Sequence, residues 1–302
     1  MLPTVSVSHT TRLWAIVEAV AATLIWSSSF VLVKMALDSV GPLTVTGLRY
    51  ALGGLLLILL MPLRGRTALP ITKLPRRLWL QLGVMGLTVY ALGNGAFNLS
   101  LNFMPATTVS FLAAFTPMFI MIAAIFYLQE IPTRGQGVGL LTALSGSVLF
   151  FGTGSGTLSW LGLGLALVGL ASFTHFGIAG RTIARDRRTD TITLTALPLI
   201  LGGFPVLVLA LAVEGMPRPD STALIIIPVL AVVNTAVAYM MYNHALQQLT
   251  ALEVNVIFNL SPLGTAVIAW FLLGEWLLFS QIIGMVIVII GVTVVQWQRR
   301  SA

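Results

Sequence analysis

Polar and aromatic side chains recur at helical spacing inside stretches of the chain that are otherwise apolar. Tyr90, Asn94 and Asn98 follow one another at intervals of four residues, which places them on one side of an α-helix. Tyr239 and Asn243 stand at the same interval in a later stretch. Phenol and amide groups can hold the polar part of an uncharged or zwitterionic small molecule in a cavity, and they can equally join two helices by hydrogen bonds. The second interpretation applies with most force to Asn98 and Asn243.

Other residues of these stretches offer further chemistry. Trp26 combines an apolar ring with an indole donor, which suits contact with an aromatic or aliphatic group. His175 can change charge near neutral pH, so it could relay a proton or serve as a structural hydrogen-bonding group. Lys34, Asp38 and Arg49 lie near one another and could pair among themselves or attract a carboxylate. The residues expected to line a substrate cavity are Trp26, Tyr90, Asn94, Asn98, Phe111, Phe115, His175, Tyr239, Asn243 and Asn259.

The sequence contains no recognisable set of catalytic or metal-binding residues. It has no cysteine, and neither a His-Glu-x-x-His nor a Gly-x-Ser-x-Gly motif occurs. His9, His175 and His244, its three histidines, form no obvious metal cluster. A P-loop for ATP is missing as well. We therefore expect no enzyme activity, no bound metal and no cofactor.

The stretches that must position these residues have the composition of membrane helices. Of the 302 residues, 57% are hydrophobic and only 8% are charged, which leaves too little polar surface for a water-soluble protein. Apolar stretches of about 20 residues recur, each long enough to cross a hydrocarbon core as a helix. Ten are predicted, at 13–36, 43–62, 78–100, 105–128, 136–153, 158–180, 191–213, 222–246, 251–273 and 279–297. The sequence thus predicts an all-α membrane protein with ten transmembrane helices.

The basic residues are distributed unevenly between the two ends of these helices. If the ten helices alternate in direction, thirteen of the sixteen lysines and arginines fall on one face of the membrane. They are Arg12, Arg64, Arg66, Lys73, Arg76, Arg77, Arg134, Arg181, Arg185, Arg187, Arg188, Arg299 and Arg300. Such an excess marks the cytoplasmic side. It predicts a multi-pass protein of the cell (inner) membrane with both termini in the cytoplasm, and it explains the net charge of +7 without a nucleic-acid partner.

The chain also matches itself when it is shifted by 145 residues. Residues 91–146 align with residues 236–291 without a gap and share thirteen identities. A chain of this composition would give roughly four by chance. Each copy contains five apolar stretches, an odd number, so the second copy must cross the membrane in the opposite sense. We predict two inverted five-helix repeats, residues 1–153 and 154–302, with a substrate site between them near the middle of the membrane.

Two repeat-matched residue pairs suggest mechanical roles. Pro117 matches Pro262 inside the fourth and ninth stretches, where a proline removes a backbone hydrogen bond and permits a kink. Both could form the hinge of a gating motion, or they could simply be tolerated in a packed bundle. Glu130 matches Glu275 just before the fifth and tenth helices, where a carboxylate can accept first-turn amides. We expect these two acids to be structural caps.

Several of these features together resemble a known group of proteins. A Trp-Ser-x-Ser-Phe segment begins at Trp26, and Leu273-Gly274-Glu275 is followed by Gly284 and Gly291. With ten stretches in two halves, this pattern resembles the drug/metabolite transporter superfamily, and within it the EamA-type branch. The first half departs from the pattern, because Gln129 replaces the more usual glycine. The resemblance implies a secondary exporter of small metabolites, similar to bacterial exporters of aromatic and hydrophobic amino acids.

The function expected from the sequence is therefore export of small amphiphilic metabolites, chiefly neutral aromatic and hydrophobic amino acids, by alternating access. Efflux of lipophilic drug-like compounds is the alternative, because the same aromatic side chains would suit them. A membrane channel or structural protein is a more remote alternative, since it would not require inverted halves. The partners are a small-molecule substrate and the lipid bilayer, and a ten-helix bundle can enclose its own pathway as a monomer.

Overall fold

The computed structural model describes residues 9–60, 74–128, 133–152, 158–184, 191–249, 254 and 257–298. These residues form helices and contain no β-strand. The helices are α1 (His9–Ala36), α2 (Pro42–Leu60), α3 (Arg76–Met85), η3 (Gly86–Gly93), α4 (Asn94–Ser100), α5 (Ala106–Ala113), α6 (Thr116–Leu128), α7 (Arg134–Gly152), α8 (Trp160–Ala184), α9 (Thr191–Val213), α10 (Ser221–Ala231), η4 (Val232–Val237), α11 (Ala238–Gln248), α13 (Ser261–Leu273) and α14 (Phe279–Gln298). The prediction of an all-α protein is confirmed.

These helices combine into the ten membrane-spanning rods that the apolar stretches predicted. Helices α3, η3 and α4 form one rod, α5 and α6 a second, and α10, η4 and α11 a third, while α13 forms most of the ninth. Within the described chain, six segments are long and apolar enough to cross a membrane: Arg12–Ala36, Pro42–Leu60, Ala106–Ala123, Arg134–Gly152, Thr195–Val213 and Ser221–Tyr242. Shorter apolar helices cover Trp160–His175, Ser261–Leu273 and Phe279–Val295.

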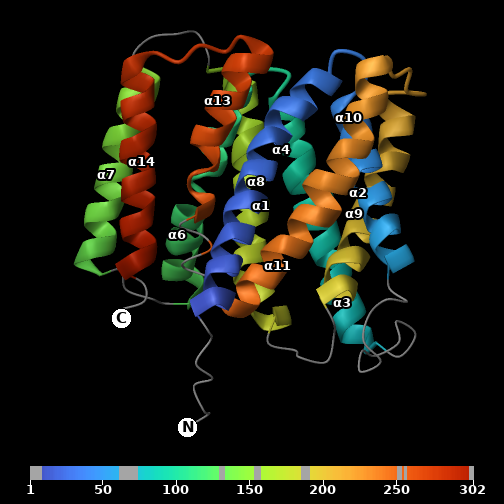
Figure 1. Ribbon diagram of the computed structural model, residues 1–302, viewed down its shortest axis with the longest axis horizontal. Helices are drawn as coiled ribbons and strands as arrows, with labels where there is room; N and C mark the ends of the chain where they lie inside the picture. The colour runs from blue at the N-terminus through green and yellow to red at the C-terminus, as the bar shows by residue number, and fades with distance from the viewer. Residues whose placement is uncertain are drawn as a thin grey trace.

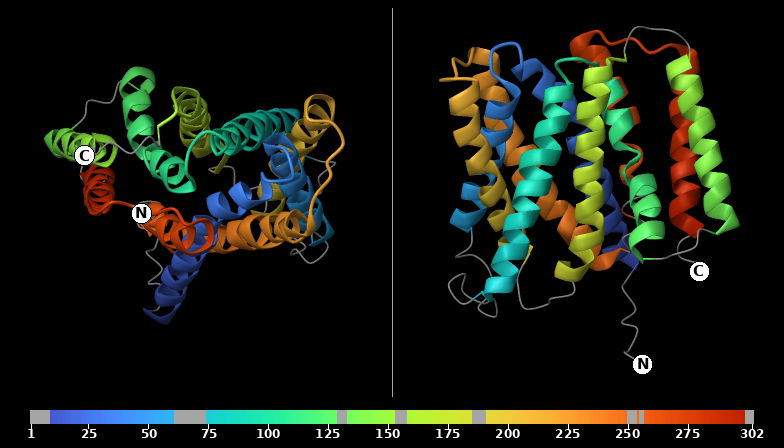
Figure 2. Two further views of the ribbon diagram at one scale, coloured as in Figure 1. Left: turned by 90° about the horizontal axis from the view of Figure 1, so that it is seen from above. Right: turned by 180° about the vertical axis from the view of Figure 1, so that it is seen from behind.

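The second five rods run opposite to the first five. Helix α1 rises from the lower end of the bundle, whereas α8, the first rod of the second half, descends (Figures 1 and 2). The start of α1 and the end of α14 therefore lie at the same end of the molecule. Because each half has five rods, this is the inverted arrangement that the internal repeat predicted.

Contacts between the rods follow the same symmetry. Matched rods lie side by side in two places, α2 against α9 and α7 against α14, at the two sides of the bundle (Figure 1). Helix α1 packs against α10, η4 and α11 of the second half. Its counterpart α8 packs against α3, η3 and α4 of the first half. The first rod of each half therefore packs against the third rod of the other half, and these contacts join the two repeats.

Repeat-matched glycines allow the α7–α14 pair to approach closely. A Cβ atom added to Gly139 would lie 2.7 Å from the carbonyl oxygen of Gly291, and one added to Gly146 would lie 2.6 Å from that of Gly284. Gly139 matches Gly284 in the repeat, and Gly146 matches Gly291. The repeat therefore relates the two contacts to each other as equivalent contacts. At both, only a residue without a side chain fits.

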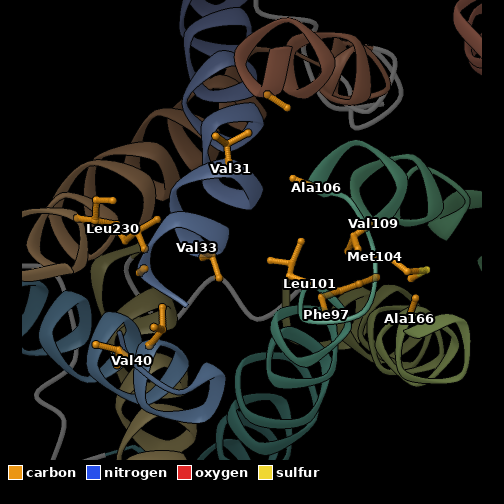
Figure 3. Packing of buried hydrophobic residues seen from close by; sticks show 14 of the residues in the cluster. Val31, Val33, Val40, Phe97, Leu101, Met104, Ala106, Val109, Ala166 and Leu230 are labelled. Atoms are coloured by element: carbon orange, nitrogen blue, oxygen red, sulfur yellow. The ribbon is translucent and has the colours of Figure 1, made fainter. Parts of the chain in front are cut away.

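The largest buried apolar cluster lies between the two halves. Figure 3 shows its labelled side chains gathered from α1, the α1–α2 connection, α8, α10 and the chain around the α4–α5 junction. Val31 and Phe97 are among its buried members. On the outside of the bundle, large apolar side chains are freely exposed, including Leu59 at 74% and Val148 at 73%. An outer surface of this kind is stable only against lipid, so the bundle lies within a membrane.

Candidate functional site

Two matched rods change helix type at equivalent positions. The third rod contains the π-helix η3 and the eighth contains η4, and both fall at the same place in the repeat. A π-helical turn widens the helix and shifts its hydrogen bonding, and such turns are frequent at functional sites. Side chains satisfy carbonyl groups five residues earlier in both turns. Asn94 Nδ2 donates to Val89 O at 2.9 Å, and Thr235 Oγ1 donates to Leu230 O at 2.9 Å.

Asn234 of η4 joins three rods at this level of the bundle. Its side-chain nitrogen donates to the carbonyl oxygen of Ile25 and, at 2.9 Å, to Ser28 Oγ, both in α1. Its own carbonyl oxygen accepts a hydrogen bond from Trp26 Nε1 at 2.8 Å and one from Arg49 Nη2 at 3.2 Å. Asn234 is 1% exposed. The residue therefore fixes α1 and α2 of the first half against the second half.

An aromatic cluster surrounds Trp26 beside this junction. The indole ring lies 4.9 Å from the ring of Tyr239, 5.5 Å from Tyr242 and 4.8 Å from Phe258, measured between centroids. Tyr239 also contacts Tyr90 of the first half at 5.9 Å. All except Tyr90 keep part of their surface exposed. We call Trp26, Tyr90, Tyr239, Tyr242 and Phe258 the aromatic site.

The aromatic site has polar groups on the α1 side as well. Ser27 Oγ donates to Thr23 O and lies 3.3 Å from Ser261 Oγ at the start of α13, while Thr265 Oγ1 donates to Ser27 O at 2.9 Å. Gly264 makes this approach possible, because a Cβ atom there would lie 2.5 Å from Ser27 Oγ. The polar segment around Trp26 is thus fixed on two sides by the second half.

The two rods that contain the matched prolines are broken rather than kinked. Helix α5 ends at Ala113 and α6 begins at Thr116, and a turn at 259–260 precedes α13 in the same way. Pro117 and Pro262 occupy the first turn of the helix that follows each break. A proline is tolerated in a first turn because its missing N–H would have no partner there. The symmetry of the breaks supports a hinge, which stays a prediction.

The remaining predicted site residues have varied environments. Asn98 is 5% exposed and its Nδ2 donates to Thr46 Oγ1 of α2 at 2.8 Å, which is the interhelical hydrogen bond that the sequence left as an alternative. Phe111 is fully buried and stacks on Phe150 at 4.0 Å, so it packs between α5 and α7 in this conformation instead of lining an open space. Phe115 is half-buried beside Phe111 at 5.4 Å.

Three further predicted residues are not among the rings of the aromatic site, although Asn259 directly follows Phe258 in the chain. His175 on α8 has an exposed side chain. Asn259 is 5% exposed in the turn before α13. The side chain of Asn243 lies outside the described residues, as does Glu130.

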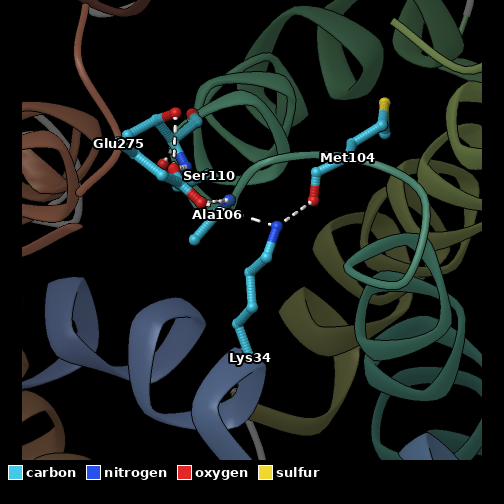
Figure 4. A network of polar contacts seen from close by, with 6 residues as sticks. Lys34, Met104, Ala106, Ser110 and Glu275 are labelled. Atoms are coloured by element: carbon cyan, nitrogen blue, oxygen red, sulfur yellow. Dashed lines mark hydrogen bonds and ion pairs between the residues drawn. The ribbon is translucent and has the colours of Figure 1, made fainter. Parts of the chain in front are cut away.

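Glu275 caps a helix, but a different helix from the one expected. Its carboxylate accepts the backbone N–H of Ala106 at 2.9 Å and that of Thr107 at 3.1 Å, together with the Thr107 hydroxyl at 2.9 Å. These groups belong to the first turn of α5 in the other half. Lys34 Nζ reaches the same carboxylate at 3.5 Å and donates to Met104 O at 2.8 Å (Figure 4). Glu275 therefore ties the second half to the first.

The helices that follow the two loops are capped by glutamines instead. Gln136 Oε1 accepts the N–H of Thr133 at 2.9 Å, and Gln281 Oε1 accepts the N–H of Leu278 at 2.9 Å. Each glutamine stands at the third position of its helix, from which it reaches back to the residue before the helix. Gln136 and Gln281 occupy matched positions of the repeat, which could have indicated this capping role from the sequence. The sequence interpretation did not assign it.

The cluster of three charged residues predicted near one end of the bundle is not formed. Lys34 pairs with Glu275, and Arg49 instead donates through Nε to Thr235 Oγ1 at 2.9 Å. No ion pair among Lys34, Asp38 and Arg49 occurs within the described chain. Arg49 was expected to pair with Lys34 or Asp38 or to attract a carboxylate, and its contacts with Thr235 and Asn234 were not foreseen. Asn234 is a polar residue of the site that the sequence interpretation did not name, because its counterpart in the repeat is Val89.

The described residues contain no group of three or more histidine, cysteine, aspartate or glutamate side chains that could hold a metal ion. The arrangement offers rings, hydroxyl groups, amides and one guanidinium. Such groups can bind an amphiphilic molecule and release it unchanged.

Comparison with known proteins supports transport across a membrane. A model of the EamA-like transporter family matches residues 13–152 and, a second time, residues 160–297. A Chlamydia trachomatis protein named S-adenosylmethionine/S-adenosylhomocysteine transporter is 27% identical over 265 residues, which cover 83% of this chain and 79% of the relative. The uncharacterized transporter YoaV of Bacillus subtilis is 23% identical over 282 residues, covering 90% and 93% of the two chains. The uncharacterized inner membrane transporter YhbE of Escherichia coli is 26% identical over 263 residues, covering 83% and 78%.

A solved crystal structure has the same fold. It superimposes with a TM-score of 0.69 at 18% sequence identity, and the match covers 96% of this chain and 100% of the other.

Proposed function

Because the chain belongs to the EamA-like transporter family, we propose that it exports neutral aromatic and hydrophobic amino acids across the cell membrane by alternating access. That it is a multi-pass membrane transporter of small molecules follows from the family and from the helical bundle. The choice of cargo, the direction and the mechanism are the parts proposed here.

The aromatic site is the observation that carries the choice of cargo. Trp26 meets Tyr239, Tyr242 and Phe258 at the boundary between the two halves, and all four residues keep part of their surface exposed. Such rings form favourable contacts with an aromatic or branched aliphatic side chain. The hydroxyl and carbonyl groups nearby suit the polar end of an amino acid.

Position between the halves supports alternating access. The α1 rod of the first half is bound to η4 and α13 of the second half on either side of Trp26. A rocking motion of one half against the other would expose a ligand held at this boundary to one side and then to the other. Broken rods at Pro117 and Pro262 supply places where such a motion could occur without breaking additional helical hydrogen bonds.

A second candidate cargo is S-adenosylmethionine, and the relatives from Chlamydia favour it. Two matches from that species, at 27% identity, are named as transporters of this compound and of S-adenosylhomocysteine. Both compounds combine a flat purine ring with an amino-acid end. Rings of the aromatic site could stack on a purine as well as on a phenyl group.

We propose further that both termini face the cytoplasm and that a single chain forms the pathway. The excess of basic residues that the sequence assigns to one face of the membrane supports this orientation. Lipophilic drug-like compounds are the alternative cargo, since aromatic side chains would also suit them.

Flux in liposomes tests the proposal. The purified protein is reconstituted, and uptake of radiolabelled phenylalanine, leucine and S-adenosylmethionine is measured with and without an imposed pH gradient. We expect saturable amino-acid uptake that unlabelled aromatic amino acids inhibit. Replacing Trp26 by alanine should reduce it at least tenfold, whereas the exposed Trp14 of the same helix, replaced in the same way, should leave it unchanged. Inhibition by lipophilic cations alone would refute the amino-acid cargo.

A further inference from the structure

Arg49 is a buried cation in the membrane-spanning part of the bundle. It exposes 6% of its surface and lies on α2, about 10 Å along the helix from Pro42. Its described partners are the Thr235 hydroxyl at 2.9 Å, the Asn234 carbonyl oxygen at 3.2 Å and the Tyr50 ring, whose centroid lies 5.1 Å from the guanidinium carbon. All three partners are uncharged.

Lys34, a second cation on a membrane-spanning helix, has a carboxylate partner. Its Nζ lies 3.5 Å from a carboxylate oxygen of Glu275. Arg49 forms no ion pair within the described residues, where its hydrogen bonds go to Thr235 and Asn234. A buried charge without a counter-ion is costly, and the cost falls when an anion is bound beside it. A neutral side chain such as glutamine could donate to the same two oxygens, so the hydrogen bonds alone do not require a charge.

Arg49 and the aromatic site converge on one atom. The carbonyl oxygen of Asn234 accepts Trp26 Nε1 at 2.8 Å and Arg49 Nη2 at 3.2 Å. The indole and guanidinium nitrogens are therefore no more than about 6 Å apart. A guanidinium has five donors in a planar fork, and the two described hydrogen bonds engage Nε and Nη2. A molecule against the Trp26 ring would thus lie within reach of a cation suited to carboxylate.

We propose that Arg49 binds the carboxylate of the transported molecule, so that the cargo class is carboxylate-bearing molecules with an aromatic or apolar group. This inference rests on the proposed function and narrows it. It applies to amino acids and to S-adenosylmethionine alike, because both carry an α-carboxylate. Lipophilic cations without a carboxylate are excluded as cargo, since the buried guanidinium repels them.

Paired competitors test the carboxylate requirement directly. Uptake of radiolabelled phenylalanine into liposomes is inhibited with phenylalanine or with phenylalaninamide, and uptake of leucine with leucine or leucinamide. In the wild-type protein we expect each amide to inhibit roughly 30-fold more weakly than its acid, or weaker still. In Arg49→Gln, inhibition by the acid should weaken to the level seen with the amide. In Arg49→Lys, the acid should still inhibit more strongly than the amide, but by a smaller factor than in the wild type.

Thr235→Val separates carboxylate binding from a purely structural role. This variant removes one hydrogen bond of Arg49 and keeps its charge, so the preference for acid over amide should persist. If Thr235→Val abolishes the preference as Arg49→Gln does, or if Arg49→Gln weakens acid and amide equally, Arg49 is only a structural tie. Should Arg49→Gln not fold, the wild-type comparison and Arg49→Lys decide, and equal inhibition by acid and amide refutes the assignment.

The outcomes also distinguish this inference from the function on which it rests. Wild-type transport of acid and amide with equal efficiency refutes the role of Arg49 and leaves amino-acid export standing. Uptake of S-adenosylmethionine alone refutes amino-acid cargo. Loss of that uptake in Arg49→Gln, but not in Thr235→Val, would still support the assignment. Absence of any uptake refutes both proposals.

Discussion

A few acceptor groups of the second half hold the two halves of this protein together at its most polar points. The Asn234 carbonyl accepts donors from α1 and α2, and the Glu275 carboxylate accepts donors from the first turn of α5. Glu214 does the same for α2, accepting the N–H groups of Leu43 and Thr44 at 2.9 Å each. Two carboxylates of the second half thus cap two helices of the first, at the end of the bundle away from the start of α1.

Loss of the Glu275 carboxylate should destabilise the protein. Glu275→Ala removes three hydrogen bonds to the first turn of α5, and loss of a helix cap costs about 0.5–2 kcal/mol. We expect the midpoint of thermal unfolding in detergent to fall by a few degrees. Glu275→Gln, which keeps an acceptor oxygen, should fall less.

Lys34→Met provides the matched comparison. The ammonium and the Glu275 carboxylate are partly exposed, at 30% and 14%, and such pairs contribute little. The effect of Lys34→Met on the unfolding midpoint should therefore be smaller than that of Glu275→Ala. A larger effect would mean that the ion pair, and not the cap, joins the halves.

At the level of helix pairs, close approach of α7 and α14 depends on glycine. Gly139→Val would place side-chain atoms against the backbone of Gly291, which cannot move aside, and overpacking of this kind costs about 1–3 kcal/mol or more. We expect poor yield of folded protein in detergent, measured by size-exclusion chromatography. Gly137→Val, on the same helix with open space around it, should behave like the wild type. Equal behaviour of the two variants would contradict the close packing.

The broken rods lead to a kinetic prediction. Pro117→Ala and Pro262→Ala restore a backbone donor at the start of α6 and α13, which would favour a continuous helix across each break. If the breaks are hinges, the maximal rate of flux should fall severalfold in each variant while the apparent affinity changes little. Unchanged flux in both variants would remove the hinge from the mechanism.

For the molecule as a whole, orientation in the membrane can be tested with little alteration of the chain. Because the sequence contains no cysteine, a single introduced cysteine is the only thiol. Met216 is 82% exposed between α9 and α10, and Arg77 is exposed near the start of α3. The α9–α10 connection and the start of α3 lie at opposite ends of the bundle (Figure 1). Met216→Cys should react with an impermeant reagent on intact cells, and Arg77→Cys only after permeabilisation. The reverse pattern would overturn the proposed orientation.

Much of the architecture could be read from the sequence because it depends on properties that are local or repeated along the chain. Runs of apolar residues predicted the ten rods, and an odd number of them in each repeat predicted the inversion. Kinks were expected at Pro117 and Pro262. The structure instead has a break in the helix just before each of these prolines.

The polar contacts of the site could not be read in this way, because they join residues that are far apart in the chain. Trp26 and Asn234 are separated by 208 positions, and Glu275 and Ala106 by 169. Hydropathy and periodicity identify which face of a helix is polar, but the partner of a donor depends on how closely two rods approach and on the register between them. A π-helical turn shifts that register by one residue, which is why the contacts of the Asn234 carbonyl oxygen with Trp26 and Arg49 could be identified only in the folded structure.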